Sequence, residues 1–438
     1  MWSYRCRWLA ALAVLSCCMW VGRTSAGEEF SQIWGRATTS RLRNVQAADL
    51  TGDGFAEVLL LTGGRGGPVE MNALDPVDGS SLWRRSLLPG GCAVPVRRGS
   101  GTRCDVAAAS GDTLLILAGA SGRVRARGTL PGVVGELAVG DLTGNGSDEV
   151  VCTSGNDLND ALTCWDAAEA TQLWRLKCSP VEGRRDDGFG LPLVIPGEGL
   201  NGPSVVVREH RTNVTLVSAD GLVDWRTSVG TASGPVPLGM IVAGPFAADL
   251  EGISRLDVVV GTLDGHLVVL DGVSGDVLRS RVFGGDGHRE LAARRRLPSS
   301  VRSLLLESGE PASGYSAVEA NGVPGDELLF VTADGVAHEY SARADTLLWA
   351  RALGACPEFG PVVVQTPSGT PGAVVATPDS TFVIGIQSGV SIRGLVPTAG
   401  CTRVLLESFL PGETLSILRA DWRSGTLALH PTRLVPAR

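Results

Sequence analysis

Two short motifs recur along the chain in a fixed order, and this repetition restricts the possible folds more than any other feature. The first motif is a small apolar strand, a turn rich in Asp and Gly, and a β-branched strand. The second is a strand, a turn with Asp and often Gly, and a strand that usually ends in Trp. In each of four copies, the last residue of the second motif follows the turn acid of the first by 30 to 34 residues. Such a repeat predicts small antiparallel sheets that bury their faces by stacking.

The copies of the two motifs differ in how well they are preserved. The acidic turn is clearest at 48–58 and 140–150 and is eroded at 249–258 and 319–328. The second motif ends at Trp83, Trp174, Arg279 and Trp349. The longer gaps between acidic turns leave room for further units of about 45 residues, a common propeller repeat length. We therefore expect an all-β fold, a β-propeller with seven blades of four-stranded antiparallel sheets; eight blades are the alternative. The 58 Gly residues and the 19% charged residues agree with many short strands and tight turns.

The two ends of the chain are expected to close the ring together. The segment from Phe30 to Trp34 precedes the first acidic turn, and the segment from Cys401 to His430 lacks a complete unit of its own. An open ring would expose strand edges, which proteins avoid. Pairing the two segments in one sheet removes those edges.

Residues 1–26 have the pattern of a signal peptide. Arg5 and Arg7 precede an apolar segment from Trp8 to Val21, which is shorter than the roughly 20 residues that a membrane helix needs. We expect cleavage before a single propeller domain at 27–438, without a transmembrane segment in the mature chain; an uncleaved anchor is the alternative. The expected location is secreted or extracellular, with the endoplasmic reticulum lumen or the cell surface as alternatives. The net charge of -8 argues against a nucleic-acid partner, and the arginines form no binding stripe along the sequence.

The two well-preserved acidic turns are candidate Ca²⁺ sites. Calcium prefers six to eight hard oxygen ligands, which alternate residues of a turn can supply from one side. The expected ligands of the first turn are Asp49, Thr51, Asp53, the Phe55 carbonyl and Glu57. Those of the second are Asp141, Thr143, Asn145, the Ser147 carbonyl and Glu149. A tight Asp/Gly turn without metal is the alternative. We expect no metal at the eroded turns, because Ile253 and Val323 replace the central oxygen ligand.

These acidic turns resemble the FG-GAP (VCBS-type) repeats of the integrin α-chain propeller and related surface proteins. The second motif resembles the Trp-docking repeats of quinoprotein propellers, as in Ala73-Leu74-Asp75, Gly79 and Trp83. The resemblance is specific within residues 45–83 and 137–174. It implies the propeller fold and the calcium loops, but not integrin ligand binding.

Seven cysteines follow the expected cleavage point, which suits an oxidising compartment. Cys152 and Cys164 flank a turn centred near residue 158, so we expect them opposite each other in a disulfide. Two further proposed pairs are Cys92 with Cys104 and Cys356 with Cys401, and all three pairs together leave Cys178 free. For N-glycosylation we expect occupancy at Asn213 and none at Asn145, which would be needed in the second metal turn.

The expected function is a non-enzymatic, calcium-stabilised interaction module that presents its loops to a protein or glycan partner. One alternative is a lumenal subunit of a secretory-pathway complex, with a possible membrane-associated assembly. The other is a quinoprotein-like or sugar-processing enzyme. The five His are scattered, and no nucleotide-binding or hydrolase motif occurs in a suitable context. The Trp residues are expected to pack between blades; a glycan-stacking role would require them to be exposed.

Overall fold

The structure is a computed structural model, and it describes most of the chain from residue 33 onward. The described residues are 33–38, 40–64, 66–99, 101–155, 160–178, 188–195, 197, 200–230, 241–262, 265–283, 315–318, 325–332, 336–353, 361–365, 371–376, 380–386, 391–397, 403–407, 416–421, 426–431 and 435–436. The predicted signal peptide, the proposed pair of Cys356 with Cys401 and the eroded turn residues 319–324 lie outside them.

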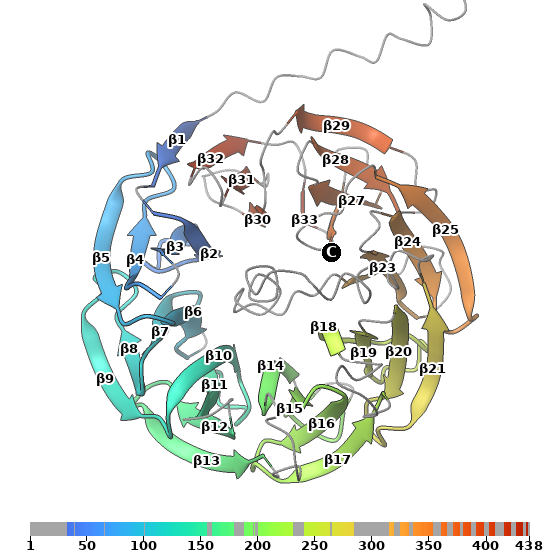
Figure 1. Cartoon of the computed structure of the whole chain (residues 1–438). Helices are drawn as coiled ribbons and strands as arrows, with labels where there is room; N and C mark the ends of the chain where they lie inside the picture. Colours follow the sequence, from blue (N-terminus) through green and yellow to red (C-terminus); the bar gives the residue numbers. More distant parts are fainter. Residues whose placement is uncertain are drawn as a thin grey trace, which may run out of the picture.

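Eight antiparallel sheets follow one another around a ring in the described part of the chain (Figure 1). Blades 1 to 4 comprise β2 (Leu42–Ala48), β3 (Glu57–Gly63), β4 (Val69–Leu74), β5 (Ser81–Leu87); β6 (Cys92–Arg97), β7 (Cys104–Ser110), β8 (Thr113–Leu117), β9 (Val124–Thr129); β10 (Val133–Gly140), β11 (Glu149–Gly155), β12 (Ala161–Asp166), β13 (Thr171–Lys177); and β14 (Phe189–Ile195), β15 (Ser204–Glu209), β16 (Asn213–Ser218), β17 (Val223–Ser228). Blades 5 to 7 comprise β18 (Ile241–Ala248), β19 (Asp257–Thr262), β20 (His266–Asp271), β21 (Val277–Val282); β22 (Tyr315–Val318), β23 (Glu327–Val331), β24 (Val336–Ser341), β25 (Thr346–Ala352); and β26 (Val362–Gln365), β27 (Pro371–Ala376), β28 (Ser380–Gly385), β29 (Ser391–Pro397), with β33 (Val435–Pro436) added beside β26. Blade 8 comprises β30 (Arg403–Glu407), β31 (Ser416–Asp421), β32 (Thr426–Pro431) and β1 (Trp34–Ala37).

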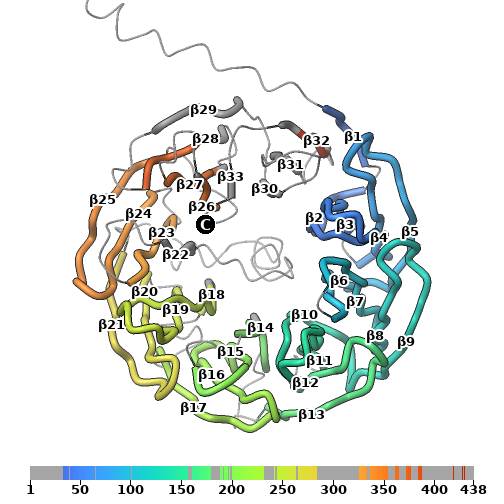
Figure 2. The backbone as a smooth tube through the Cα atoms, turned by 180° about the vertical axis from the view of Figure 1, so that it is seen from behind, coloured from blue at the N-terminus to red at the C-terminus, as the bar shows by residue number. Residues whose placement is uncertain are grey.

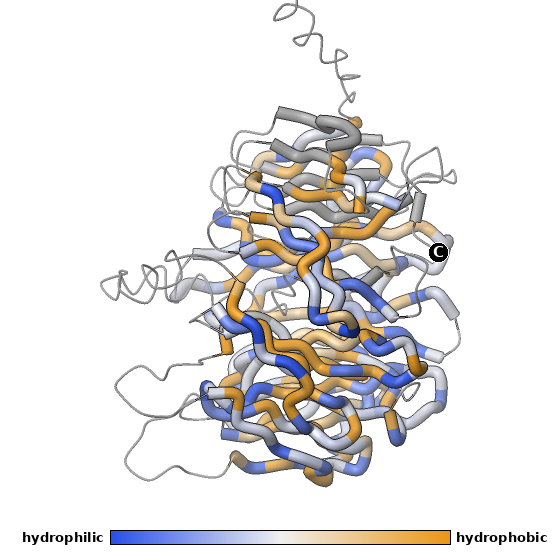
Figure 3. The backbone as a smooth tube through the Cα atoms, turned by 90° about the vertical axis from the view of Figure 1, so that its right-hand side faces the viewer, coloured by the Kyte–Doolittle hydropathy of each residue, from blue (hydrophilic) through white to orange (hydrophobic). Residues whose placement is uncertain are grey.

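The predicted fold class is confirmed, and the number of sheets is the larger of the two that the repeat count allowed. Each blade places its first strand near the centre of the ring and its fourth strand on the outside (Figure 1). The second strands are buried along their length, as in β3 and β11, because they are covered on both faces by neighbouring blades. The outer strands β9 and β25 instead alternate in burial from residue to residue, with one face toward solvent. In the side view of Figure 3, hydrophobic and hydrophilic segments are correspondingly interspersed along the strands.

The chain ends close the ring, as the sequence predicts. Strand β1 pairs antiparallel with β32, and Trp34 lies opposite Leu429. The same core cluster joins both to Val45 and Val58 of blade 1. Figure 2 shows β1 beside β32 from the opposite side. Blade 8 is therefore built from both ends of the chain, and this shared sheet accounts for the eighth blade.

Five tryptophans repeat one docking contact between consecutive blades. Each indole Nε1 donates to a carbonyl of the next blade: Trp34 to Pro76 (2.7 Å), Trp83 to Gly119 (2.5 Å), Trp174 to Ala219 (2.7 Å), Trp225 to Gly272 (3.0 Å) and Trp349 to Ile386 (2.6 Å). A positive-φ glycine lies against four of the rings, where an added Cβ would approach within 2.9 Å: Gly79, Gly122, Gly221 and Gly275. The tryptophans thus form inter-blade packing, as predicted, and their burial does not favour glycan stacking.

The predicted disulfide between Cys152 and Cys164 is wrong. Cys152 lies opposite Thr163 and Cys164 lies opposite Val151, so the two cysteines are offset by one residue in the ladder. A one-residue offset directs side chains to opposite faces of a sheet, and the two thiols belong to different core clusters. Both are free.

The proposed pair of Cys92 with Cys104 is also wrong, because these residues lie at opposite ends of the β6–β7 ladder. Cys92 is opposite Ala109, whereas Cys104 is opposite Arg97. Both thiols are free.

Candidate functional site

The first acidic turn connects β2 to β3 and is closed by its own carboxylates. Asp49 accepts hydrogen bonds from the backbone N–H groups of Gly52 (2.6 Å), Asp53 (3.2 Å) and Gly54 (3.0 Å). Glu57 reaches back from the start of β3 and accepts from the N–H groups of Leu50 (2.6 Å) and Thr51 (3.1 Å) and from the Thr51 hydroxyl (3.0 Å). Asp53 accepts from the Phe55 N–H (2.9 Å). These bonds satisfy backbone donors that no strand pairs.

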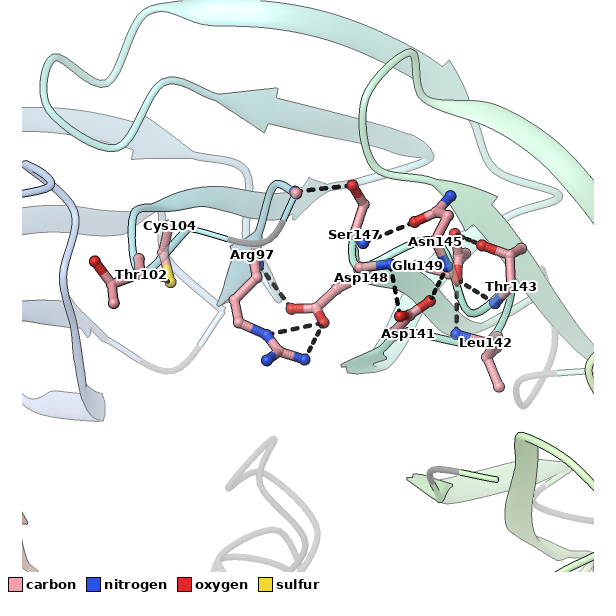
Figure 4. Close-up of polar contacts among 12 residues, drawn as sticks. Arg97, Thr102, Cys104, Asp141, Leu142, Thr143, Asn145, Ser147, Asp148 and Glu149 are labelled. Carbon is pink, nitrogen blue, oxygen red and sulfur yellow. Dashed lines mark hydrogen bonds and ion pairs between the residues drawn. The ribbon is translucent and has the colours of Figure 1, made fainter. Parts of the chain in front are cut away.

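The second acidic turn, between β10 and β11, repeats this arrangement (Figure 4). Asp141 accepts from the N–H groups of Asn145 (3.0 Å) and Gly146 (2.8 Å). Glu149 accepts from the N–H groups of Leu142 (2.7 Å) and Thr143 (3.1 Å) and from the Thr143 hydroxyl (3.1 Å). Asn145 accepts from the N–H of Ser147 (2.7 Å), which parallels the role of Asp53 in the first turn.

Both turns also contact blade 2. The Thr102 hydroxyl donates to Asp49 (2.9 Å) from one side. On the other side, two contacts reach the second turn: Arg97 forms an ion pair with Asp148 (3.0 Å), and the Gly99 N–H donates to the Ser147 hydroxyl (2.9 Å; Figure 4). The loop between β6 and β7 therefore lies between the two acidic turns and is held by both. Anything that rigidifies these turns also fixes blades 1, 2 and 3 relative to one another.

The third acidic turn, between β18 and β19, keeps only half of this network. Asp249 accepts from the N–H groups of Ile253 (3.0 Å) and Ser254 (2.7 Å), as its counterparts do. Asp257, however, occupies the position of Glu57, is 1% exposed and has no hydrogen-bond partner at either carboxylate oxygen. An Asp side chain is one methylene shorter than Glu, which explains why it does not reach back to the turn N–H groups.

The pKa values of the buried acids also distinguish the first two turns from the third. Burial raises the pKa of Glu57 and of Glu149, and the hydrogen bonds that each accepts from its turn lower it. The negative charge of Asp53 raises the pKa of Glu57 further, and that of Asp141 does the same for Glu149. Burial raises the pKa of Asp257 to about 7, and the surrounding acids Glu251, Asp271 and Asp249 contribute. Without hydrogen bonds to its charged form, Asp257 has little to offset burial.

The first two turns contain the oxygen donors that a calcium ion requires. Three carboxylates in the first turn and two in the second accompany a threonine hydroxyl and a backbone carbonyl, all hard oxygen ligands. In the first turn each Asp49 oxygen already accepts two hydrogen bonds, so the remaining carboxylate lone pairs are those of Asp53 and Glu57. In the second turn each Asp141 oxygen accepts one. The residue types therefore suit calcium, and the first turn offers the greater negative charge, but its three carboxylates do not bring their oxygens within 4.8 Å of one another.

One cluster was not anticipated from the sequence. In the described parts of the chain, one group of three metal-ligating side chains brings its ligand atoms within 4.8 Å of one another: Cys178, Glu209 and His210. Cys178 follows β13 in blade 3, while Glu209 ends β15 in blade 4. The cysteine and the histidine are 32 positions apart, so only the blade register could have revealed their proximity.

The predicted glycosylation site lies in blade 4. Asn213 begins β16 and is half-buried, and Thr215, the last residue of its sequon, is fully buried and bonded to Glu209 (2.8 Å). Asn145 is exposed within the second acidic turn. Occupancy at Asn213 and its absence at Asn145 stay predictions.

The outer strands carry a charge pattern that the linear sequence conceals. Strands β5, β9, β13, β17, β21 and β25 contain ten basic residues and one acid, Asp224. The whole chain has the opposite balance, with a net charge of -8. The arginines form no stripe along the sequence, but the fold places nine of them and Lys177 on the outer rim, here defined as these six strands.

Comparisons with known proteins support the fold and leave the family open. No protein-family model matches the chain, and neither does any curated protein. Among solved structures, BamB from Moraxella catarrhalis is 13% identical with a TM-score of 0.55, covering 92% of this chain and 100% of that one. Sqt1 from Saccharomyces cerevisiae is 11% identical with a TM-score of 0.59, covering 93% and 100%. BBS1N, in a complex with ARL6DN, is 11% identical with a TM-score of 0.50, covering 93% and 97%.

These similar structures are β-propellers, as this chain is. At such low identity they establish the architecture alone. In addition, none of the described residues forms a helix that is long and apolar enough to span a membrane.

Proposed function

We propose that this chain is a non-enzymatic interaction module of the secretory pathway, an FG-GAP-type propeller stabilised by calcium at its first two acidic turns. Its partner is a protein with an acidic surface, bound at the outer rim. The observation that carries the proposal is the concentration of ten basic residues on six outer strands of an acidic chain. Complementary charge steers association and selects partners.

Several basic side chains of the rim are available to a partner. Arg127, Arg175 and Lys177 are exposed on the adjacent strands β9 and β13. Lys and Arg on an outer strand also discourage edge-to-edge aggregation, and that role alone would be served by charges of either sign. Five of the rim arginines form ion pairs with acids outside the rim. The excess of positive charge that remains on consecutive blades goes beyond protection against aggregation and favours recognition of an anionic surface.

The propeller fold also suits a protein-interaction module. A ring of short sheets gives a rigid scaffold with a large accessible perimeter, and rigid surfaces bind without a large ordering penalty. The propeller BBS1N was solved in a complex with the protein ARL6DN, which illustrates such use of the architecture. A lumenal subunit of a secretory-pathway complex is one form that this function would take.

The test compares two triple variants of the secreted or lumenal protein by quantitative affinity capture. The rim variant replaces Arg127, Arg175 and Lys177 with Gln. The control replaces Arg98, Arg103 and Arg343 with Gln; these are exposed and lie outside the outer strands. Both variants remove the same charge, so a general electrostatic effect would affect them equally.

We expect partners of the wild type to be lost from the rim variant and kept by the control. Their retention should also fall as salt rises, since exposed charges are screened over about 8 Å at physiological ionic strength. Equal capture by all three proteins would contradict binding at the rim.

A further inference from the structure

We propose that Cys178, Glu209 and His210 bind a zinc ion at the junction of blades 3 and 4. Neither the acidic turns nor the outer rim includes these residues. Thiolate, imidazole and carboxylate are the three ligand types that zinc takes in proteins. Three protein ligands would leave a fourth position for water or another ligand.

The distances between the ligand atoms match a tetrahedral zinc site. Cys178 Sγ lies 3.7 Å from Glu209 Oε1 and 3.5 Å from His210 Nε2. His210 Nε2 lies 4.0 Å from Glu209 Oε1. Tetrahedral geometry at ordinary zinc bond lengths of about 2.0–2.3 Å places ligand atoms about 3.4–3.6 Å apart. The distances from the sulfur to the other two ligand atoms are therefore already close to those around a bound zinc ion. The distance between the nitrogen and the oxygen would have to shorten by about 0.6 Å.

Hydrogen bonds from neighbouring side chains orient the Glu209 carboxylate so that its Oε1 faces Cys178 and His210. Arg226 donates from Nε to Oε2 and from Nη2 to Oε1 (3.0 Å), and the Thr215 hydroxyl donates to Oε2 (2.8 Å). Oε2 is thus occupied by two donors, whereas Oε1 has one and also faces Cys178 and His210. Carboxylates that bind metals are characteristically oriented by such hydrogen bonds.

The backbone also fixes the other two ligands. The Cys178 N–H donates to the Asp160 carbonyl (2.8 Å), and the His210 N–H donates to the Gly188 carbonyl (2.7 Å). His210 adopts a φ of 53°, a conformation that is uncommon for a residue with a side chain. Glu209 is fully buried and His210 is 9% exposed, so the ligands are mostly shielded from water. A zinc ion here would join the outer strand of blade 3 to blade 4.

The experiment measures zinc on the full-length secreted chain, purified in reducing buffer, stripped with chelator and then equilibrated with zinc alone. Metal analysis after removal of excess ion should give about one zinc per chain. Zinc should also raise the thermal midpoint. Cobalt in place of zinc should give a thiolate-to-metal charge-transfer band, which reports directly on the cysteine ligand.

Three variants decide the outcome. Cys178→Ser should lose the bound zinc and the charge-transfer band, whereas Cys92→Ser, which changes another half-buried cysteine, should keep both. His210→Asn tests the site independently, since asparagine tolerates positive φ but lacks the imidazole. Absence of zinc from the wild type would overturn the proposal. So would retention of zinc and of the cobalt band by Cys178→Ser, or by a folded His210→Asn protein.

Discussion

The buried carboxyl of Asp257 should make the stability of this propeller fall as pH rises through neutrality. Asp257 is 1% exposed, has no hydrogen-bond partner at either oxygen and is surrounded by other acids. Burial therefore raises its pKa to about 7. The folded chain holds this proton up to about pH 7, whereas the unfolded chain releases it near pH 4.

The sign and size of the effect follow from proton linkage. Between these two pH values the folded state binds more protons than the unfolded state, so the free energy of unfolding decreases as pH increases. The contribution of Asp257 is complete below about pH 4 and lost above about pH 7. A separation of about three pH units corresponds to about 4 kcal/mol, at about 1.4 kcal/mol per unit.

Replacing Asp257 with Asn removes this titration and leaves the rest of the turn in place. We expect the stability of Asp257→Asn relative to the wild type to rise by about 4 kcal/mol between about pH 4 and pH 8. The buried amide has unsatisfied groups of its own, which cost about 1–3 kcal/mol at every pH. That cost displaces the whole curve without changing its slope.

The assay is urea denaturation in the presence of chelator, repeated across this pH range. Glu339, whose pKa burial also raises to about 7, gives the same slope in both proteins and cancels from the difference. Asp112→Asn, at an exposed acid, is the matched control and should follow the wild-type profile. Parallel curves for wild type and Asp257→Asn would refute a neutral, buried carboxyl at this position.

Three further outcomes test the turns, the ring closure and the docking contacts. Calcium at a hundredfold excess over its dissociation constant should add about 2.7 kcal/mol, and calorimetry should show Asp53→Ala losing more of this response than Asn145→Ala; identical melting with calcium and with chelator would count against both sites. Trp34→Ala should cost about 3–5 kcal/mol in denaturation experiments, because its indole joins blade 8 to blade 1; an unchanged midpoint would mean that the ring closes without β1. Gly275→Ala should destabilise more than Gly144→Ala by thermal melting, because both have positive φ but only the former would place Cβ 2.6 Å from a docked indole; equal losses would leave backbone strain as the whole effect.

The repeat pattern predicted the architecture because it is carried by local residues. A turn acid, a positive-φ glycine and a docking Trp each act within one blade or on its neighbour, so their spacing encodes the sheets and their stacking. The closure of the ring followed from the need to cover the edges left at the two ends. The exact number of blades depended on where eroded units begin, which sequence periodicity marks poorly.

The features that the sequence did not predict depend on the register of paired strands and on the length of individual side chains. The hairpin around residue 158 indicated that Cys152 and Cys164 were near each other, but a shift of one residue places them on opposite faces. The eroded third turn was judged by its missing central ligand, whereas the consequential change was Asp257 in place of Glu. The contact between Cys178 and His210 spans two blades and leaves no local pattern.

The pairing of β1 with β32 has a consequence for biogenesis. Trp34 is among the first residues of the propeller to leave the ribosome, and its partner Leu429 is among the last. At 5–20 residues per second, synthesis separates them by about 20–80 s. Throughout that interval blade 1 lacks the neighbour that covers Val45 and Val58, and the nascent chain presents an open sheet edge. The end of translation is thus the first moment at which the ring can close, and until then the apolar side chains at this junction stay uncovered.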